Sequence, residues 1–457
     1  MGMPAQGAVL AGAVPLGGQA PRPERRPRLK VLLVGHACCP EVGSEPGLTW
    51  NWARSLAEHH DVWLVAHPAH RDQVEAALAD RPQPGLSVHW VEVEAAWDPW
   101  IPGRGERGIH LHYLLWQRAA FHTCAQLHER MRFDLTHHVS WGTINAPPGL
   151  WRLGAPFVWG PIGGGQSAPL RFHSYLGSGV MTEAVRAARL ALLPMQPSLR
   201  AAARRSAAVL ATNRETARLL ERAGCPFVRL FLDNGVMPAS LRTGWTPPAG
   251  RLELLWAGRI ESRKALALAL HAMARVRDLP ARLTVAGDGA ERARCEALAV
   301  SLGLQERVRF LGMVPRQQMD RLFAGSSALL FTSLQDAFGS VVLEAMAAGL
   351  PILGLDHQGV GAMIPEAAAL KAPVHSPDAA LAGLAQGMRR LLDDPDLLHR
   401  MGAAARAHAA TELWPERARR MTDIYHQCVE QHHGHPTIPE DDCPGALLPQ
   451  ELARRRA

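Results

Sequence analysis

The stretch ALLFTSLQDAFGSVVLEAMAAGLPILGL, residues 328–355, decides the fold class. Its beginning, ALLFTS, has the length and apolar pattern of a buried strand, VVLEAMAA has helical spacing, and Gly349 with Pro351 ends that helix before a second apolar strand. Strand, helix and strand in this order predict a βαβ unit with parallel strands covered by helices. We therefore expect an α/β chain.

The loop and helix start inside this unit predict an anion site flanked by acids. In a βαβ unit, the loop after the first strand and the helix N-terminus lie at the carboxyl edge of the sheet, where unpaired N–H groups favour an anion. Gly339, Ser340 and Val341 occupy this position, between Asp336 and Glu344. Carboxylates beside an anion repel it, so these two are better explained as acceptors of hydrogen bonds. The donors would be hydroxyls of the molecule that carries the phosphate, such as those of a ribose and a sugar. The alternative is an ordinary capped helix with two solvated acids.

A second anion signal lies upstream, in LELLWAGRIESRKALALALHAMARV, residues 252–276. A strand pattern reaches Gly258, Arg259 follows in a loop, and Lys264 stands at the predicted start of a helix. Only three of the 49 basic residues are lysines, and an ammonium does not replace a guanidinium freely as a phosphate ligand. The apolar stripe of the helix consists of Leu266, Leu270, Met273 and Val276. A chance lysine on a solvated face is the alternative.

Four blocks, taken in order, resemble the C-terminal domain of a GT4-type retaining glycosyltransferase, a group 1 glycosyltransferase of the GT-B fold. These blocks are GRIESRK (258–264), VAGDGAE (285–291), VRFLGMV (308–314) and DAFGSVVLEAMAAGLPI (336–352). Two N-terminal blocks resemble a bacterial subgroup of this family that is involved in surface polysaccharides. They are GSEPGLTWNWARSLA (43–57) and WRLGAPFVWGPIGGG (151–165). The resemblance covers most of residues 29–427.

The resemblance implies two Rossmann-like domains that face each other across a cleft. The expected divisions are a disordered leader (1–28), an acceptor-side domain (29–237), a linker (238–251), a nucleotide-sugar-binding domain (252–412), a helix crossing back to the first domain (413–431) and a disordered tail (432–457).

The resemblance also assigns roles to the residues around the two anion signals. Arg259 and Lys264, with the helix start, would meet the charge of the departing nucleoside diphosphate. Glu344 would accept from the ribose, and Asp336 would hold the transferred sugar. The family usually has glutamate where this chain has Asp336, which leaves the choice of donor sugar open. The other expected donor-binding residues of this domain are Gly258, Phe338, Gly339, Ser340 and Val341.

Two site residues are expected in the first domain. Gly43 lies in a strand-to-helix turn that resembles the first glycine-rich loop of GT-B enzymes, and an ordinary βα turn is the alternative. FDLTHHVSW, residues 133–141, ends a strand, where neighbouring residues point to opposite faces. Only one of His137 and His138 can then face the cleft. Because relatives often carry a histidine near the donor sugar, we predict His138, against the alternative of a buried histidine.

The loop GPIGGGQ, residues 160–166, places four glycines after an apparent strand. Glycine has an entropic cost on folding, so this density predicts tight turns or a close backbone approach to a ligand. A flexible connection is the alternative.

Composition agrees with a globular chain of two domains, because 457 residues include 47% apolar and 20% charged residues. Seven cysteines form no disulfide framework or CxxC spacing, which fits a reducing compartment. The 22 histidines include no metal-binding motif, so we expect neither metal nor cofactor. A net charge of +7 suits an anionic partner, a nucleotide sugar rather than nucleic acid, for which no motif is present.

We expect a cytoplasmic protein. No segment has the roughly 20 apolar residues of a spanning helix, and the chain start lacks the basic region and apolar core of a signal peptide. The arginine-rich stretch 183–205 could rest on the anionic inner surface of the membrane. A solvated helical face is the alternative.

The expected activity is metal-independent transfer of a sugar from a nucleotide sugar to a hydroxyl of a glycan or lipid-linked glycan, with retention of configuration. In such a reaction, the acceptor hydroxyl would give its proton to the departing phosphate, so no protein base is required. One alternative is a catalytically silent sensor or scaffold, for which Asp336 is a hint and against which Arg259 and Lys264 argue. Another is a GT-B sugar-nucleotide epimerase, whose acid/base residues are not evident.

Overall fold

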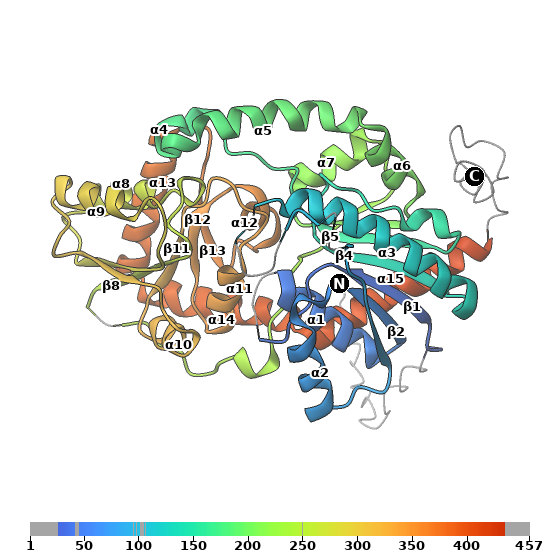
Figure 1. The fold of residues 1–457 in the computed structure, drawn as a ribbon. Coiled ribbons are helices and arrows are strands. Elements are labelled where there is room, and N and C mark those ends of the chain that lie inside the picture. Colours follow the sequence, from blue (N-terminus) through green and yellow to red (C-terminus); the bar gives the residue numbers. More distant parts are fainter. Residues whose placement is uncertain are drawn as a thin grey trace, which may run out of the picture.

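The computed structural model describes residues 26–41, 45–94, 96, 98–100, 105, 107–248 and 250–434. Most of the predicted leader and tail, and Gly43, lie outside these residues. The described chain forms two parallel sheets, each covered by helices, side by side in Figure 1. The predicted α/β class is thereby confirmed.

The first sheet has seven strands in the order β3-β2-β1-β4-β5-β6-β7. Its strands are β1 (Lys30–Gly35), β2 (Asp61–Ala66), β3 (Leu86–Trp90), β4 (Leu135–Ser140), β5 (Phe157–Ile162), β6 (Ala208–Ala211) and β7 (Val228–Leu230). The helices are α1 (Glu45–Ala57), α2 (Arg71–Asp80), α3 (Ile109–Met131), α4 (His173–Leu176), α5 (Val180–Leu192), α6 (Pro197–Arg205) and α7 (Arg214–Arg222). The central strands are almost continuously buried because helices cover both faces.

The second sheet has six strands in the order β10-β9-β8-β11-β12-β13. Its strands are β8 (Leu252–Ala257), β9 (Ala281–Ala286), β10 (Val308–Gly312), β11 (Ala328–Phe331), β12 (Ile352–Leu355) and β13 (Ala369–Ala372). The helices are α8 (Leu266–Ala274), α9 (Arg292–Ser301), α10 (Arg316–Ala324), α11 (Ser340–Ala347), α12 (Gln358–Met363), α13 (Pro377–Asp393), α14 (Pro395–Thr411) and α15 (Trp414–Gly434). The βαβ unit read from residues 328–355 is β11-α11-β12, with β11 and β12 paired in parallel.

The last helix, α15, packs against the first domain although it follows the second in the chain. Its residues Trp414, Met421 and Tyr425 belong to the same apolar core as β1 and α1, and Figure 1 shows α15 beside these elements. Buried Arg417 fixes the crossing, because its guanidinium bonds to Glu412 at 2.5 Å and donates to the carbonyl of Leu232. The two domains are therefore joined at two points of the chain.

A second exchange runs in the opposite direction, after β5. Phe172 and Leu176 leave the first domain and lie in the core of the second, and α5 then leads the chain back across the top of Figure 1. The glycine loop 160–166 of the first domain also approaches the second domain closely, at Ala337. A Cβ at Gly163 would lie 3.1 Å from that of Ala337, and Gly164 has a φ of +91°. The glycines thus provide tight turns and a domain contact.

Candidate functional site

A polar cavity of about 310 Å³ lies between the domains, at the carboxyl ends of strands from both sheets. Open α/β sheets bind ligands at this edge. The first-domain wall consists of Glu45, Leu48, Asp233 and Asn234. The second-domain wall consists of Arg259, Arg263, Lys264, Asp336, Ala337, Gly339 and Ser340.

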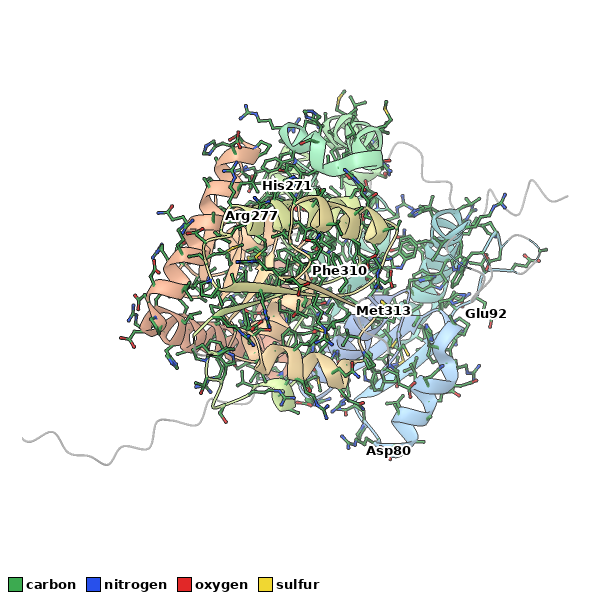
Figure 2. All side chains as sticks on the ribbon, turned by 90° about the vertical axis from the view of Figure 1, so that its left-hand side faces the viewer. Asp80, Glu92, His271, Arg277, Phe310 and Met313 are labelled. Atoms are coloured by element: carbon green, nitrogen blue, oxygen red, sulfur yellow. The ribbon has the colours of Figure 1, made fainter. Side chains whose placement is uncertain are left out.

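A more apolar cavity of about 300 Å³ adjoins the polar one and shares Arg259, Lys264, Gly339 and Ser340 with it. Its other lining residues are Ala257, Gly258, Ala286, Gly287, Met313, Val314, Met319 and Val341. Met313 is 76% exposed and lies in the middle of the face shown in Figure 2, just after β10. A flat apolar ring would fit between these side chains while a charged group remained in the polar cavity.

Lys264 and Asp336 form an ion pair in the second-domain wall, and their side chains are 17% and 18% exposed. The helix expected to start at Lys264 begins instead at Leu266, and Lys264 ends a short 3₁₀ helix (Ser262–Lys264). Ala265 then has a φ of +48°, which turns the chain into α8. This break directs the ammonium into the cavity instead of along a helix surface.

Two arginines give the second-domain wall a positive balance. Arg259 is 68% exposed, with its Nε 3.4 Å from Glu261, whose other oxygen lies 2.8 Å from the Nε of Arg263. Arg263 also donates to the carbonyl of Gln335 at 3.2 Å. With Lys264, three cations face the carboxylates of Glu261 and Asp336, so one positive charge is left for an anionic ligand.

The start of α11 lies in the same wall and has no side-chain cap. Gly339 is required there because its φ is +93° and a Cβ would lie 2.9 Å from the ring of Phe331. Ser340 and Val341 open the helix, whereas the side chain of Phe338 is buried in the core, so Phe338 can offer only its backbone to a ligand. The N–H groups at this uncapped start are suited to an anion.

Gln358 positions the loop that carries Asp336, and no sequence pattern pointed to this residue. Its Oε1 accepts from the Asp336 N–H at 2.7 Å, and its Nε2 donates to the carbonyl of Ser167 in the first domain at 3.1 Å. The residue has a φ of +51° and is buried. Asp336 is therefore held partly through the other domain.

Glu344 lines a neighbouring cavity of about 650 Å³ that extends along α1 of the first domain. Its side chain is 36% exposed and lies 3.9 Å from a guanidinium nitrogen of Arg316. Burial raises the pKa of Glu344, and Arg316 opposes this effect. Ser340 lines both this cavity and the polar one, so a ligand at the start of α11 can reach Glu344.

The first-domain wall contributes two carboxyl groups that the sequence interpretation missed. Burial raises the pKa of Glu45 to about 7, and the nearby carboxyl of Asp233 adds to this shift. Burial also raises the pKa of Asp233, which positive Arg417 opposes. Glu45 was visible inside the GSEPG block, but a single glutamate at a helix start usually signals only a favourable helix dipole.

His138 lies in the interior of the first domain and outside the cavity walls. It is 1% exposed, its Nε2 is 3.2 Å from the Tyr113 hydroxyl, and burial lowers its pKa to about 3. His137 points to the other face of β4, with its ring nitrogens 2.5 Å from the Tyr425 hydroxyl and 2.6 Å from the Gly160 carbonyl. The strand thus directs one histidine to each side, and the structure does not bring His138 to the other predicted site residues.

A cluster of three buried histidines lies near the carboxyl ends of β1 and β2. One ring nitrogen from each of His36, His67 and His112 lies within 4.8 Å of the others. His112 donates through Nδ1 to Asp98 at 2.7 Å and shares a hydrogen bond of 2.9 Å with His36. His67 accepts from the Ala69 N–H at 3.2 Å. These bonds use one ring nitrogen of His36, one of His67 and both of His112, and Nδ1 of His36 is buried without a partner among the described residues.

Two parallel-sheet domains with a polar cavity between their carboxyl edges define a protein of the GT-B type. Residues 241–408 match the model of the family "Glycosyl transferases group 1". The resemblance expected from the sequence is therefore confirmed over these residues.

The chain is also similar in sequence to curated glycosyltransferases and in fold to solved structures. The chain is 31% identical over 208 residues to a D-inositol 3-phosphate glycosyltransferase of Streptomyces bingchenggensis, covering 43% of this chain and 44% of the relative. It thus spans less than half the length of this relative. A sucrose-phosphate synthase structure from Thermosynechococcus elongatus superposes with a TM-score of 0.60 at 19% identity, over 88% of this chain and 100% of the other. Anabaena HepE in complex with UDP-glucose gives 0.54 at 16% identity, over 89% and 100%.

Proposed function

We propose that this protein transfers a sugar from a nucleotide-sugar donor to a hydroxyl of a glycan or lipid-linked glycan, with retention of anomeric configuration. The observation that carries the proposal is the second-domain wall, in a cavity between two domains, where three cations outnumber the two carboxylates that they face and an uncapped helix start adds N–H groups. Turnover of the donor, rather than binding alone, separates this proposal from a silent binding protein.

The character of the two adjoining cavities supports the following placement of the donor. Its diphosphate lies against Arg259, Lys264 and the N–H groups at the start of α11. Its base enters the apolar cavity beside Val314 and Met319, both of which line it. The ribose hydroxyls donate to Glu344 from the outer side of α11. This placement directs the sugar toward Asp336 and the first-domain wall.

Cations and backbone donors supply the chemistry. When the bond between the sugar and the phosphate breaks, negative charge grows on the nucleoside diphosphate, and fixed donors in a site with little water stabilise it most effectively. Lys264 can leave its ion pair with Asp336 and bind the phosphate as charge develops, while Asp336 accepts from a sugar hydroxyl. We propose that this arrangement works without a metal ion.

Release of nucleoside diphosphate from a panel of UDP-, GDP- and ADP-sugars tests this proposal. UDP-glucose is the first donor to try because the structurally similar HepE binds it. D-inositol 3-phosphate and simple glycosides serve as trial acceptors, since the curated relatives carry the former in their names. We expect turnover of one donor with a product of the donor's anomeric configuration. Absence of binding to every donor would refute the proposal.

We further propose a cytoplasmic protein that contacts the inner membrane surface through α5. None of the helices in the described ranges combines the length and apolarity that a bilayer crossing requires. On α5, Met181, Val185 and Leu192 are 72%, 61% and 66% exposed, and Arg186 and Arg189 accompany them. Apolar side chains among arginines are typical of an interfacial helix that prefers anionic lipid.

Sedimentation with vesicles tests the membrane contact. We expect binding to vesicles of phosphatidylglycerol and phosphatidylcholine, weaker binding to phosphatidylcholine alone, and a loss of both in Met181→Ser with Leu192→Ser. A matched control is Val300→Ser, since Val300 is 57% exposed on α9 of the other domain. Equal binding by the two variants would contradict the contact.

A further inference from the structure

A small cavity of about 190 Å³, here called the α5 cavity, lies between α5 and the glycine loop of the first domain. It shares no lining residue with the donor site. Two arginines line it, together with Asn145, Gly164, Thr182 and Val185, and no carboxylate is among its described lining residues. Pockets for whole ligands usually have roughly 300–1,000 Å³, so the α5 cavity suits a single group of a larger molecule.

One of the two arginines is free to bind an anion. The Nε of Arg186 lies 3.2 Å from a carboxylate oxygen of Glu183, whose other oxygen accepts a hydrogen bond from the Ala168 N–H at 3.0 Å. The guanidinium of Arg189 is exposed and forms no ion pair or hydrogen bond with any residue that the structure describes. The α5 cavity therefore has one positive charge without a counterion.

Asn145 gives the same cavity a hydrogen-bond acceptor. Its backbone N–H and its side-chain amide both donate to Oγ1 of Thr143, at 3.2 and 3.0 Å. Its Oδ1 is left buried without a partner among the described residues. A buried acceptor without a donor is costly, and a ligand hydroxyl next to a bound anion would satisfy it. A phosphate beside a hydroxyl-bearing group has this chemistry.

The helix that carries Arg189 also presents an apolar surface. The exposed side chains of Met181, Val185 and Leu192 follow one another at intervals of four and seven residues, so they form one stripe along α5. Val185 also lines the α5 cavity, so the stripe and the arginines meet there. Figure 1 shows α5 at the outer edge of the molecule. An amphiphile with a phosphate and a hydrocarbon chain matches both features.

The glycine loop connects the α5 cavity with the transferred sugar. Gly164 lines the α5 cavity, and a Cβ on its neighbour Gly163 would lie 3.1 Å from that of Ala337. Ala337 lines the polar cavity next to Asp336, the proposed ligand of the sugar. Because consecutive Cα atoms are about 3.8 Å apart, a ligand at Arg189 needs to extend only past this loop to reach the sugar.

We propose that the α5 cavity binds the phosphate of a lipid-linked acceptor, with Arg189 as its main ligand and the lipid chain along the apolar stripe of α5. This inference rests on the proposed function and narrows its acceptor to lipids that carry a phosphate. The site holds the acceptor and takes no part in bond breaking. The attacking hydroxyl still gives its proton to the departing phosphate of the donor, as retention requires.

Calorimetry with decyl phosphate below its micelle concentration tests the site, and inorganic phosphate is the probe for the phosphate alone. Each buried methylene raises affinity roughly fourfold, so we expect wild type to bind decyl phosphate at least about tenfold more tightly than inorganic phosphate. Arg189→Ala should weaken binding of decyl phosphate roughly tenfold or more, because a charged hydrogen bond is lost. Val185→Ser should weaken binding of decyl phosphate and leave that of inorganic phosphate unchanged.

Two control variants separate the α5 cavity from other positive charge. Arg200→Ala removes an equal charge from the exposed surface of the next helix, α6, outside the cavity, and should bind decyl phosphate as wild type does. Lys264→Ala removes a phosphate ligand of the donor wall, and Arg189→Ala should have the same effect in that background. Unchanged binding in Arg189→Ala, an equal loss in Arg200→Ala, or an Arg189 effect that disappears with Lys264→Ala would overturn the site.

Binding of nucleoside diphosphates to wild type distinguishes this inference from the proposed function. If a nucleoside diphosphate binds but decyl phosphate binds no more tightly than inorganic phosphate, the acceptor is not a lipid phosphate and only this inference fails. If decyl phosphate responds to Arg189→Ala but no nucleotide or donor binds, the proposed function fails and the acceptor role fails with it. Binding of both ligands, each weakened by the variant of its own site, supports the acceptor role.

Discussion

The two walls of the polar cavity differ in charge and in how they are built. The second-domain wall gathers cations and an uncapped helix start from segments that directly follow β8 and β11. The first-domain wall holds two carboxyl groups with raised pKa values, one from the start of α1 and one from the turn after β7. A bisubstrate reaction benefits from this division, because the leaving group and the nucleophile require opposite electrostatic support.

The walls also differ in how they are held. Lys264 and the start of α11 belong to single βα turns, whereas Asp336 depends on Gln358, which reaches to Ser167 across the domain boundary. Arg417 links the Glu412 turn to Leu232, directly before Asp233. The cavity is thus assembled by contacts that the domains exchange, which implies that substitutions at the boundary act on both walls.

The largest expected effect is that of Lys264→Ala. Removing one fixed donor to a developing negative charge typically costs roughly 100- to 1,000-fold in kcat. We therefore expect the rate of nucleoside diphosphate release to fall by this factor in Lys264→Ala. In Lys264→Arg the rate should fall less. The exposed Arg277→Ala on the same domain is the matched control (Figure 2). A loss below about threefold would remove the main support for the donor wall.

Glu344→Gln should act on binding rather than on chemistry. A hydrogen bond to a charged group contributes about 1.5–3 kcal/mol, so its loss should raise KM for the donor roughly tenfold or more and leave kcat nearly unchanged. Initial rates over donor concentration give both values. An equal fall in kcat would mean that Glu344 contacts the reacting sugar, which would bring the ribose and sugar positions into question.

The sequence predicted the second-domain wall better than the first for a physical reason. A βα turn is local, so Gly339, Ser340 and Lys264 could be placed from the order of strand, loop and helix alone. The α/β class and the parallel β11-α11-β12 unit follow from the same local signals and are confirmed. The start of α8 was displaced by two residues, because the positive φ of Ala265 cannot be read from an alanine.

The first-domain wall depends on contacts between distant segments, which a single sequence does not reveal. Glu45 meets Gly142 across 97 positions of the chain, and the residue before Asp233, Leu232, accepts a hydrogen bond from Arg417 of α15, which returns to the first domain. The histidine expected there, His138, was chosen from strand alternation, and its face of β4 turned out to be covered by Tyr113. The alternation of side chains along a strand shows that His137 and His138 point to opposite faces of the sheet. It does not show which of these faces is covered by a helix.

A smaller effect is expected from Asp336→Glu, which lengthens the carboxylate that pairs with Lys264 and that we propose contacts the transferred sugar. The added methylene pushes the carboxylate away from Lys264 and toward the first-domain wall, where Asp233 is already destabilised by Asp336. We expect kcat/KM for the accepted donor to change by less than about tenfold and the preference between epimeric sugars to shift. Competition between two donors with the same nucleotide measures this. An unchanged preference would indicate that Asp336 does not touch the sugar.

The smallest expected effect is that of chelation. If the three cations of the second-domain wall replace a metal ion, dialysis against EDTA should leave the rate within about twofold, and added Mg²⁺ should not raise it. The histidine cluster sharpens this prediction, because His36, His67 and His112 are near enough to one another to hold an ion. Measuring the metal content of wild type and of His36→Ala shows whether the histidine cluster binds an ion. Stoichiometric metal lost in the variant, together with sensitivity to EDTA, would show that the first domain, and not only the second, supplies positive charge to the reaction.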